Sequence, residues 1–274
     1  MVKRRLRLFL KVIVILYFAS LLVHLVSALT LDTIIEFRSV QFSSTNLPSE
    51  MDGYKIAFIT DTHSISSDEL EKAVSELNRR QLDLLVLGGD FNPDNEELIN
   101  SLKVLSGVVT TDGIYGVEGN HDYYTWLFSA MERCSINPLS NSGAHIRNRF
   151  YLAGVADFWN RIADVEKAIE DAEKDDFVIL IAHNPDITMK QNTESIDLIL
   201  SGHTHGGHIT FFGIWAPMLT LQKTISDYGQ RFMSGWSESR DGIPVYVSNG
   251  AGKYTDVPRI FARPQIIILT LRAE

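Results

Sequence analysis

Short apolar runs that end abruptly in a polar residue recur along the chain from Tyr54 onward. Each run has about five apolar residues, many of them β-branched, followed by Asp, Asn or His and often Gly. The instances are YKIAFITDTH (54–63), LDLLVLGGD (82–90), GIYGVEGNHD (113–122), FVILIAHNPD (177–186) and LILSGHTH (198–205). Continuous apolar runs of this length are typical of strands buried on both faces. The pattern therefore predicts buried strands that each end in polar side chains.

Helical patterns separate several of these strands. Residues 67–80 begin with capping and acidic residues, and residues 93–105 and 162–174 carry apolar positions at helical spacing. Three later apolar runs, at 230–238, 243–252 and 265–273, read as strands with no helix between them. Alternating strands and helices followed by plain strands indicate an α/β fold of two packed sheets with helices outside.

The N-terminal segment has a different pattern. Val12 to Leu31 form an almost uninterrupted apolar stretch of about 20 residues, the length that a membrane span requires. The basic residues ahead of it predict a single-pass anchor with a cytoplasmic N-terminus and an extracytoplasmic body. Val26-Ser27-Ala28 resembles a signal-peptide cleavage site, so secretion after cleavage stays open. We expect an anchor or signal peptide over 1–31, a connecting segment over 32–53 and one domain over 54–274.

Charge and cysteine content narrow the function classes. Five of the 25 basic residues lie in the first eleven positions, which hold no acid, so the remainder has 20 basic against 34 acidic residues, a net charge of −14. A body this acidic is a poor general binder of nucleic acid. The single cysteine, Cys134, excludes an internal disulfide framework and a zinc site built on several thiolates.

The polar residues at the strand ends form a set of metal ligands. Side chains at the carboxyl ends of neighbouring strands converge on one crevice of an α/β sheet. Residues two apart in an extended segment point to the same side, so Asp61 with His63, and His203 with His205, can each bind an ion together. Asp90, Asn120 and His183 add a carboxylate, an amide oxygen and another imidazole.

This mixed nitrogen and oxygen set favours Zn²⁺, Mn²⁺ or Fe²⁺ over Ca²⁺. Seven ligands are too many for one tetrahedral ion but suit two divalent ions that share a bridging carboxylate. Two-metal sites of this kind drive in-line displacement at phosphorus. The ions would also supply the positive charge that the acidic body lacks.

The same residues resemble the calcineurin-like metallophosphoesterase superfamily, whose ordered motifs are D-x-H, G-D, G-N-H-[DE], a lone H and G-H-x-H. Here they stand as DTH, GGD, GNHD, AHNPD and GHTHGG. The resemblance extends from about Tyr54 to the C-terminus. SGHTHGG and the closing YVSNGAGKYTDVPRIFARPQIIILTL (246–271) look most like the branch of exported or membrane-linked phosphodiesterases. UDP-2,3-diacylglucosamine hydrolases are among the relatives of that branch.

The resemblance implies a four-layer αββα sandwich of two mixed sheets and assigns roles by position. The implied ligands are Asp61, His63 and His205 for one ion, Asn120, His183 and His203 for the other, and Asp90 as the bridge. A hydroxide between the ions would attack a phosphodiester or pyrophosphate, including a lipid-linked one. His121 would serve the leaving oxygen as a general acid or as a charge stabiliser, oriented by Asp122.

Other readings of the sequence stay open. A phosphomonoesterase or protein phosphatase would use the same ligands, and so would a non-catalytic scaffold of the same fold. His208 stands where relatives commonly have glutamine, and it is a candidate contact to substrate. Asp157 ends a further apolar run, and we expect it to cap a loop. The aromatic stretch TFFGIWAPML (210–219) reads as a core hairpin in preference to a binding site for a lipid chain.

Overall fold

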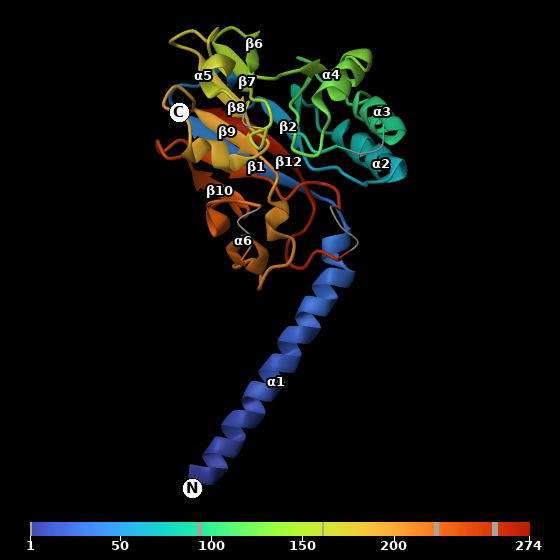
Figure 1. The fold of residues 1–274 in the computed structure, drawn as a ribbon, viewed down its shortest axis with the longest axis vertical. Helices are drawn as coiled ribbons and strands as arrows, with labels where there is room; N and C mark the ends of the chain where they lie inside the picture. Colours follow the sequence, from blue (N-terminus) through green and yellow to red (C-terminus); the bar gives the residue numbers. More distant parts are fainter. Residues whose placement is uncertain (1, 92–94, 161, 222–224, 254–256) are drawn as a thin grey trace.

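A computed structural model describes residues 2–91, 95–160, 162–221, 225–253 and 257–274. In these ranges a long helix, α1 (Val2–Leu29), extends away from a domain in which two six-stranded sheets pack face to face (Figure 1). Helices α2 (Ser67–Leu77), α3 (Asn95–Leu105) and α4 (Tyr124–Arg133) cover the outer face of the first sheet. Helix α5 (Val165–Ala168) and a 3₁₀ helix at Pro185–Met189 cover the second. The expected αββα sandwich is confirmed.

Both sheets are mixed. The first has the order β1 (Glu36–Ser44), β12 (Gln265–Ala273), β2 (Lys55–Ile59), β3 (Leu84–Leu87), β4 (Ile114–Gly116) and β5 (Asn137–Pro138). The second has the order β10 (Gly235–Glu238), β11 (Pro244–Val247), β9 (Leu198–Ser201), β8 (Phe177–Ile181), β7 (Phe150–Gly154) and β6 (Ser142–Arg147). Strands β2 to β5 run parallel, as do β7, β8, β9 and β11.

The central strands are apolar throughout because each contributes to two cores. In β2, Ile56 and Phe58 pack between the sheets, whereas Ala57 and Ile59 face the helices of the first sheet. This is the two-residue alternation of a strand applied to a sheet covered on both sides. All four of these residues are fully buried.

The observed helices agree only partly with the expected ones. Helix α2 begins as expected, with a capping box between Ser66 and Glu69, and ends three residues earlier than the pattern predicts. Helix α3 fills the described part of 93–105; the first residues of that range lie outside the described residues. The expected helix over 162–174 is wrong in length, because only Val165–Ala168 is helical.

Some strands were not expected. Residues 32–53, expected as a connecting segment, contain β1, which pairs in parallel with β12 along its whole length. Its sequence EFRSVQFSS alternates and leaves one face partly exposed, so it lacks the continuous apolar signal of the central strands. Strand β6 was also missed, whereas β7 lies in the further apolar run that precedes Asp157. In 230–238 only Gly235–Glu238 is a strand, because Gly229–Phe232 forms a 3₁₀ turn.

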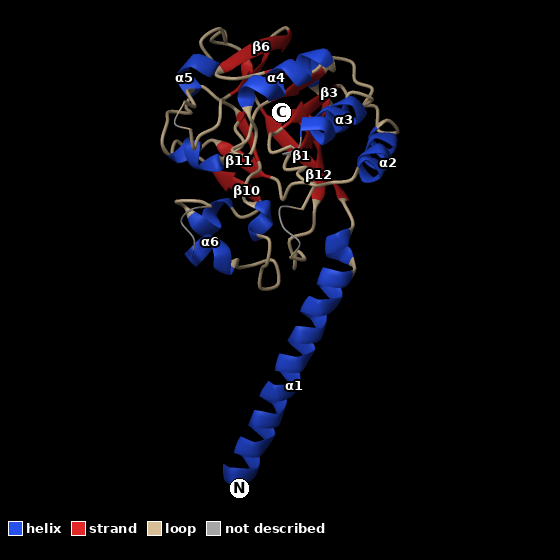
Figure 2. Cartoon of the chain, turned by 45° about the vertical axis from the view of Figure 1, so that its right-hand side comes forward, coloured by secondary structure: helices blue, strands red, loops and turns tan. Residues whose placement is uncertain are grey.

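Helix α1 is long and apolar enough to cross a membrane. Figure 2 shows it standing free of the domain over most of its length, and its apolar side chains are mostly exposed. Ser27 and Ala28, at the possible cleavage site, are buried where the helix meets the domain. An exposed apolar helix of this length indicates association with a membrane.

Candidate metal centre

The polar residues at the strand ends meet at one edge of the sandwich. Asp61 follows β2, Asp90 follows β3 and Asn120 follows β4, while His183 follows β8 and His203 follows β9. These strands run parallel within their sheets, so their carboxyl ends lie together at one edge. Asp61, His63, Asp90, His183, His203 and His205 are all buried, and Asn120 is partly buried.

Asp61, His63 and His205 form one compact group of ligand atoms. The Nε2 atoms of His63 and His205 lie 3.2 Å apart, and Nε2 of His205 lies 3.4 Å from Oδ1 of Asp61. Two nitrogens that share a tetrahedral Zn²⁺ at its usual bond length would be about 3.3 Å apart. The group therefore has the spacing of ligands around one ion.

Asp90, His183 and His203 form the second group. Oδ2 of Asp90 lies 3.2 Å from Nε2 of His183 and 3.7 Å from Nε2 of His63, which belongs to the first group. The carboxylate of Asp90 thus stands between the two groups, the position expected of a bridging ligand. The two groups divide these six residues as the family resemblance implies, and the assignment of each residue to an ion stays a prediction.

Hydrogen bonds to the backbone orient the imidazoles of the second group. Nδ1 of His183 donates to the Gly88 carbonyl at 2.8 Å, and Nε2 of His203 donates to the Ile225 carbonyl at 2.8 Å. The remaining ring nitrogen of each is left with a lone pair, as a metal ligand requires. Oδ1 of Asn120 is buried without a hydrogen-bond partner, and Nε2 of His183 is buried with the carboxylate oxygen of Asp90 3.2 Å away. A buried unpaired oxygen is costly unless a cation accepts its lone pairs, so these residues fit a metal.

The charges of the group depend on one another. Burial lowers the pKa of His183, but the carboxylates of Asp90 and Asp61 outweigh burial and raise this pKa to about 10. Burial raises the pKa of Asp61, whereas His183 and His63 hold the pKa of Asp90 well below its usual range. Burial and the neighbouring His183 lower the pKa of His203 to about 3. The ring of His183 and the carboxylates of Asp61 and Asp90 therefore each stabilise the charged form of the other.

The backbone at the site is strained. The five residues of the DTH, GGD and GHTH motifs that supply predicted ligands all have positive φ: Asp61 (53°), His63 (38°), Asp90 (55°), His203 (72°) and His205 (52°). A non-glycine residue in this region costs about 1–3 kcal/mol and persists where the surroundings over-determine it. Strain of this kind gathers at functional sites, because the turns are needed to aim side chains inward.

Asp122 connects two of the loops. Its carboxylate accepts backbone N–H bonds from Asp90 and Gly119, both at 2.8 Å, and from Phe91 at 2.9 Å. Burial and the charge of Asp90 raise the pKa of Asp122 to about 7. Its observed contacts fix the backbone that carries Asp90 and Asn120. Its role in orienting the His121 ring stays a prediction.

His121 lies where the site opens to solvent. Its side chain is exposed, its ring centroid is 5.6 Å from that of His63, and its backbone N–H donates to Oδ1 of Asp90 at 2.8 Å. A histidine in this position is accessible to a bound substrate and is fixed to the bridging carboxylate. This placement is compatible with a general acid.

Arg259 was not identified from the sequence. Its guanidinium is buried and donates to the carbonyls of Asn249 at 2.6 Å, Ala262 at 3.1 Å and Gly252, and it contacts the His205 ring. Burial lowers its pKa to about 10. Arg259 thus joins the loop after β11, which contains Asn249 and Gly252, to the GHTH loop. A lone arginine after proline carries no sequence signal for this role.

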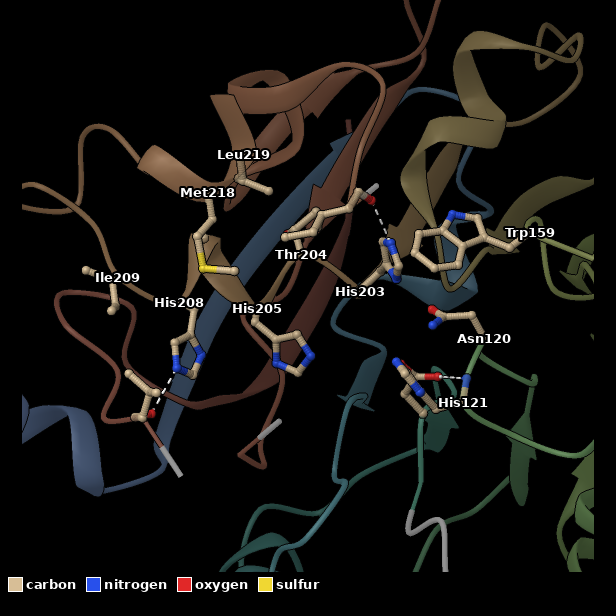
Figure 3. A pocket seen from close by; sticks show the side chains of 14 residues that line it. Asn120, His121, Trp159, His203, Thr204, His205, His208, Ile209, Met218 and Leu219 are labelled. Carbon is tan, nitrogen blue, oxygen red and sulfur yellow. Dashed lines mark hydrogen bonds between the residues drawn. The ribbon is translucent and has the colours of Figure 1, made fainter. Parts of the chain in front are cut away.

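A cavity of about 340 Å³ leads away from the metal ligands. In Figure 3, Asn120, His121 and His203 lie at one end and Ile209, His208 and Met218 at the other. Trp159, another residue missed from the sequence, packs edge-on against His203 at 5.1 Å between ring centroids. Its position two residues after the strand-end Asp157 was the available signal. His208 lines the cavity, with Nε2 2.9 Å from the Val257 carbonyl, and its contact with substrate stays a prediction.

Two structural expectations have different outcomes. Asp157 is buried and accepts the Asn160 N–H at 3.0 Å, so the capping role is confirmed. The core hairpin over 210–219 is wrong, because Phe211, Phe212, Ile214 and Trp215 are 43–79% exposed. The hairpin itself is a single bridge between Phe211 and Trp215.

Comparisons with known proteins agree with this geometry. The model of the calcineurin-like phosphoesterase family matches residues 54–207, more than half of the chain. An uncharacterized metallophosphoesterase of Helicobacter pylori (strain J99) is 31% identical over 226 residues, which cover 78% of this chain and 58% of the relative. A transmembrane protein with metallophosphoesterase domain from Danio rerio is 28% identical over 85% of this chain and 56% of its own length. This chain therefore spans somewhat more than half the length of these two relatives.

The uncharacterized metallophosphoesterase YkuE of Bacillus subtilis is 26% identical over 87% of this chain and 86% of its own length. Among solved structures, phosphopantetheinyl hydrolase from Mycobacterium tuberculosis matches 72% of this chain and 89% of its own with a TM-score of 0.44 and 10% identity. The family match includes all seven candidate ligands. With its two groups of candidate metal ligands, the chain belongs to the calcineurin-like phosphoesterase family.

Proposed function

We propose that this protein is a dinuclear metal-dependent hydrolase of phosphodiester or pyrophosphate bonds. The observation that carries the proposal is the carboxylate of Asp90, which lies within 3.7 Å of a histidine nitrogen in each ligand group. Two divalent ions, Mn²⁺, Zn²⁺ or Fe²⁺, would supply Lewis acidity and positive charge for in-line displacement at phosphorus. Asp61, His63 and His205 would hold one, Asn120, His183 and His203 the other, and Asp90 both.

The protein's own groups would do the rest of the chemistry. Asp122 fixes the amides of Asp90 and Gly119, so the bridging carboxylate and Asn120 keep their separation during turnover. The exposed ring of His121 would give a proton to the leaving oxygen and would regain it from water. A preorganised site of this kind needs little reorganisation when charge develops on the substrate.

The cavity favours an ester with a large apolar part. Ile209, Met218, Leu219, Ile225 and Val257 line it beyond the ligands. A lipid-linked substrate, such as UDP-2,3-diacylglucosamine, would place its phosphorus at the ligands and its acyl chain along this apolar wall. The basic residues in the first turns of α1 support a single-pass topology with the N-terminus in the cytoplasm and the domain outside.

Substitution of the second ligand group tests the enzyme. In Asn120→Ala and His203→Ala, metal-dependent hydrolysis of bis(p-nitrophenyl) phosphate should be lost while the circular dichroism spectrum stays that of the native protein. Glu238→Gln, in β10 and exposed, is the matched control and should keep full activity. Undiminished turnover in both ligand variants would reject the proposal.

Side-by-side rates separate the alternatives. Faster hydrolysis of p-nitrophenyl phosphate than of the diester would favour a phosphomonoesterase. A protein that binds metal but hydrolyses neither ester would favour a non-catalytic scaffold.

A further inference from the structure

A neutral apolar loop stands out on this acidic domain. Residues 210–221, TFFGIWAPMLTL, contain no charged side chain. They include α6 (Pro217–Leu221) and are named here the apolar rim. Ile214 and Leu221 are each 79% exposed, and Phe211 is 56% exposed. Aromatic and aliphatic side chains gathered on one exposed loop mark an interaction surface.

The rim is attached to α1. The ring of His24 in α1 packs against the rings of Phe211, Phe212 and Phe261, with centroids 4.6–5.2 Å apart. Asp32, buried just after the helix, accepts bonds from the Ser27 hydroxyl at 2.6 Å and the Phe261 N–H at 2.8 Å. These contacts fix the direction of the domain relative to α1.

The apolar rim and the C-terminal end of α1 both lie at the metal-site end of the sandwich. β1 begins at Glu36, which pairs with Gln265 at the start of β12. The Gln265 N–H donates to the Gly250 carbonyl, in the loop whose Gly252 N–H donates to the carbonyl of Asp61. Figures 1 and 2 show α6 and the upper end of α1 at this same end of the domain.

The depth of the rim follows from the length of α1. The hydrocarbon core of a bilayer is about 30 Å thick, which a helix spans with about 20 residues at about 1.5 Å per residue. If the near side of the core lies at Leu29, the far side lies near Phe9. Arg4, Arg5 and Arg7 then lie beyond the far side. His24, and with it the rings of the rim, lies about 7.5 Å inside the near side. Interfacial apolar elements are buried to about 5–10 Å.

The rim also satisfies its own polar groups. The Phe211 N–H donates to the Trp215 carbonyl at 2.7 Å and the Ile214 N–H to the Phe211 carbonyl at 3.0 Å. The Gly213 N–H donates to the Thr210 hydroxyl at 2.8 Å, and the Trp215 indole N–H donates to the Thr220 hydroxyl at 3.0 Å. Backbone that enters a lipid environment needs such internal partners, whereas a loop in water does not.

We propose that the apolar rim is inserted into the interface of the lipid bilayer that α1 spans. The catalytic domain then sits on the membrane with its metal-site end facing the lipid headgroups. Ile209, Met218 and Leu219, on or next to the rim, line the cavity. If the proposed function holds, the apolar part of a lipid phosphoester reaches the ions without leaving the bilayer.

Spin labels measure the insertion without any need for catalysis. Cys134→Ser removes the single cysteine, after which Ile214→Cys or Leu221→Cys carries one nitroxide on the full chain in phosphatidylcholine vesicles. The matched control is Val109→Cys, also apolar and 72% exposed, beside the bridge of Thr110 to Leu82 at the opposite end of the sheet. Collision with oxygen and with a water-soluble nickel chelate gives the depth of each label.

We expect labels at 214 and 221 to collide more with oxygen than with the nickel chelate, and the label at 109 to show the reverse. Two rim labels that are as accessible to nickel as the label at 109 would overturn the proposal. The catalytic consequence is tested with Ile214→Asp. Hydrolysis of a vesicle-bound phosphodiester should fall at least about tenfold, while that of soluble bis(p-nitrophenyl) phosphate stays unchanged. Equal loss on both substrates would contradict this consequence, and no hydrolysis of either by the native chain would reject the proposed function instead.

Discussion

Gly119 offers a sharp test of how the bridging carboxylate is held. An alanine Cβ at this position would lie 2.6 Å from the Asp90 nitrogen and 2.8 Å from the Asp90 Cγ. Carbon atoms in contact are normally about 3.5–4.0 Å apart, so Gly119→Ala must open this gap by about 1 Å. Either Asp90 moves or the loop that carries Asn120 does.

The magnitude follows from the same contacts. Asp90 Oδ2 lies 3.2 Å from the ligand nitrogen of His183, and metal sites tolerate about ±0.2 Å in bond length. A displacement of about 1 Å therefore removes the bridge, and misplacement by this distance costs about 100-fold in turnover. Overpacking itself destabilises a fold by about 1–3 kcal/mol, so most of the protein should stay folded.

The assay is the rate of bis(p-nitrophenyl) phosphate hydrolysis at saturating Mn²⁺, with urea denaturation to measure stability. Gly107→Ala is the control, because its Cβ would meet the Val104 carbonyl at 3.1 Å and the Val74 side chain at 3.7 Å, neither of which belongs to a candidate ligand. We expect full activity from the control. A Gly119→Ala enzyme that is folded and turns over at the native rate would refute the reasoning.

Three further predictions concern the surroundings of the ions. Asp122→Ala leaves three buried amides without their acceptor, and at about 1–3 kcal/mol each we expect several kcal/mol less stability in urea. Because the pKa of His183 is raised to about 10, a proton competes with the metal, so the apparent affinity measured by calorimetry should rise about tenfold per pH unit from 7 to 9. Arg259→Lys keeps the positive charge but loses the planar guanidinium that donates to several carbonyls at once. We expect the free energy of unfolding to fall by about 3 kcal/mol, which lowers the melting temperature in scanning calorimetry by roughly 6–12 °C. A pH-independent affinity, or unchanged stability in either variant, would contradict the corresponding prediction.

The features that depend on the order of neighbouring residues were predicted from the sequence. The central strands are continuous apolar runs because both faces are covered, and their polar endings identify the candidate ligands. The family resemblance assigned Asp61 and His183 to different ions; in the structure they belong to different groups of candidate ligand atoms, and their assignment to two ions stays a prediction.

Features that depend on distant pairing were not predicted. β1 is held by β12, more than 200 residues away, and its half-exposed sequence gives little local sign of a strand. Arg259 donates hydrogen bonds to carbonyls of a loop that folds around it. The spacing of residues along the sequence does not reveal such backbone contacts. The aromatic residues of the apolar rim suit either a protein interior or a membrane, so composition alone does not predict that they are exposed.

Metal content per chain tests the central claim most directly. The full chain, loaded with Mn²⁺ and freed of excess ion, should hold about two ions by inductively coupled plasma mass spectrometry. Asp90→Ala, which removes the ligand shared by both groups, should hold no more than one. Native protein with no bound ion, or two ions retained in Asp90→Ala, would contradict a centre built around the carboxylate of Asp90.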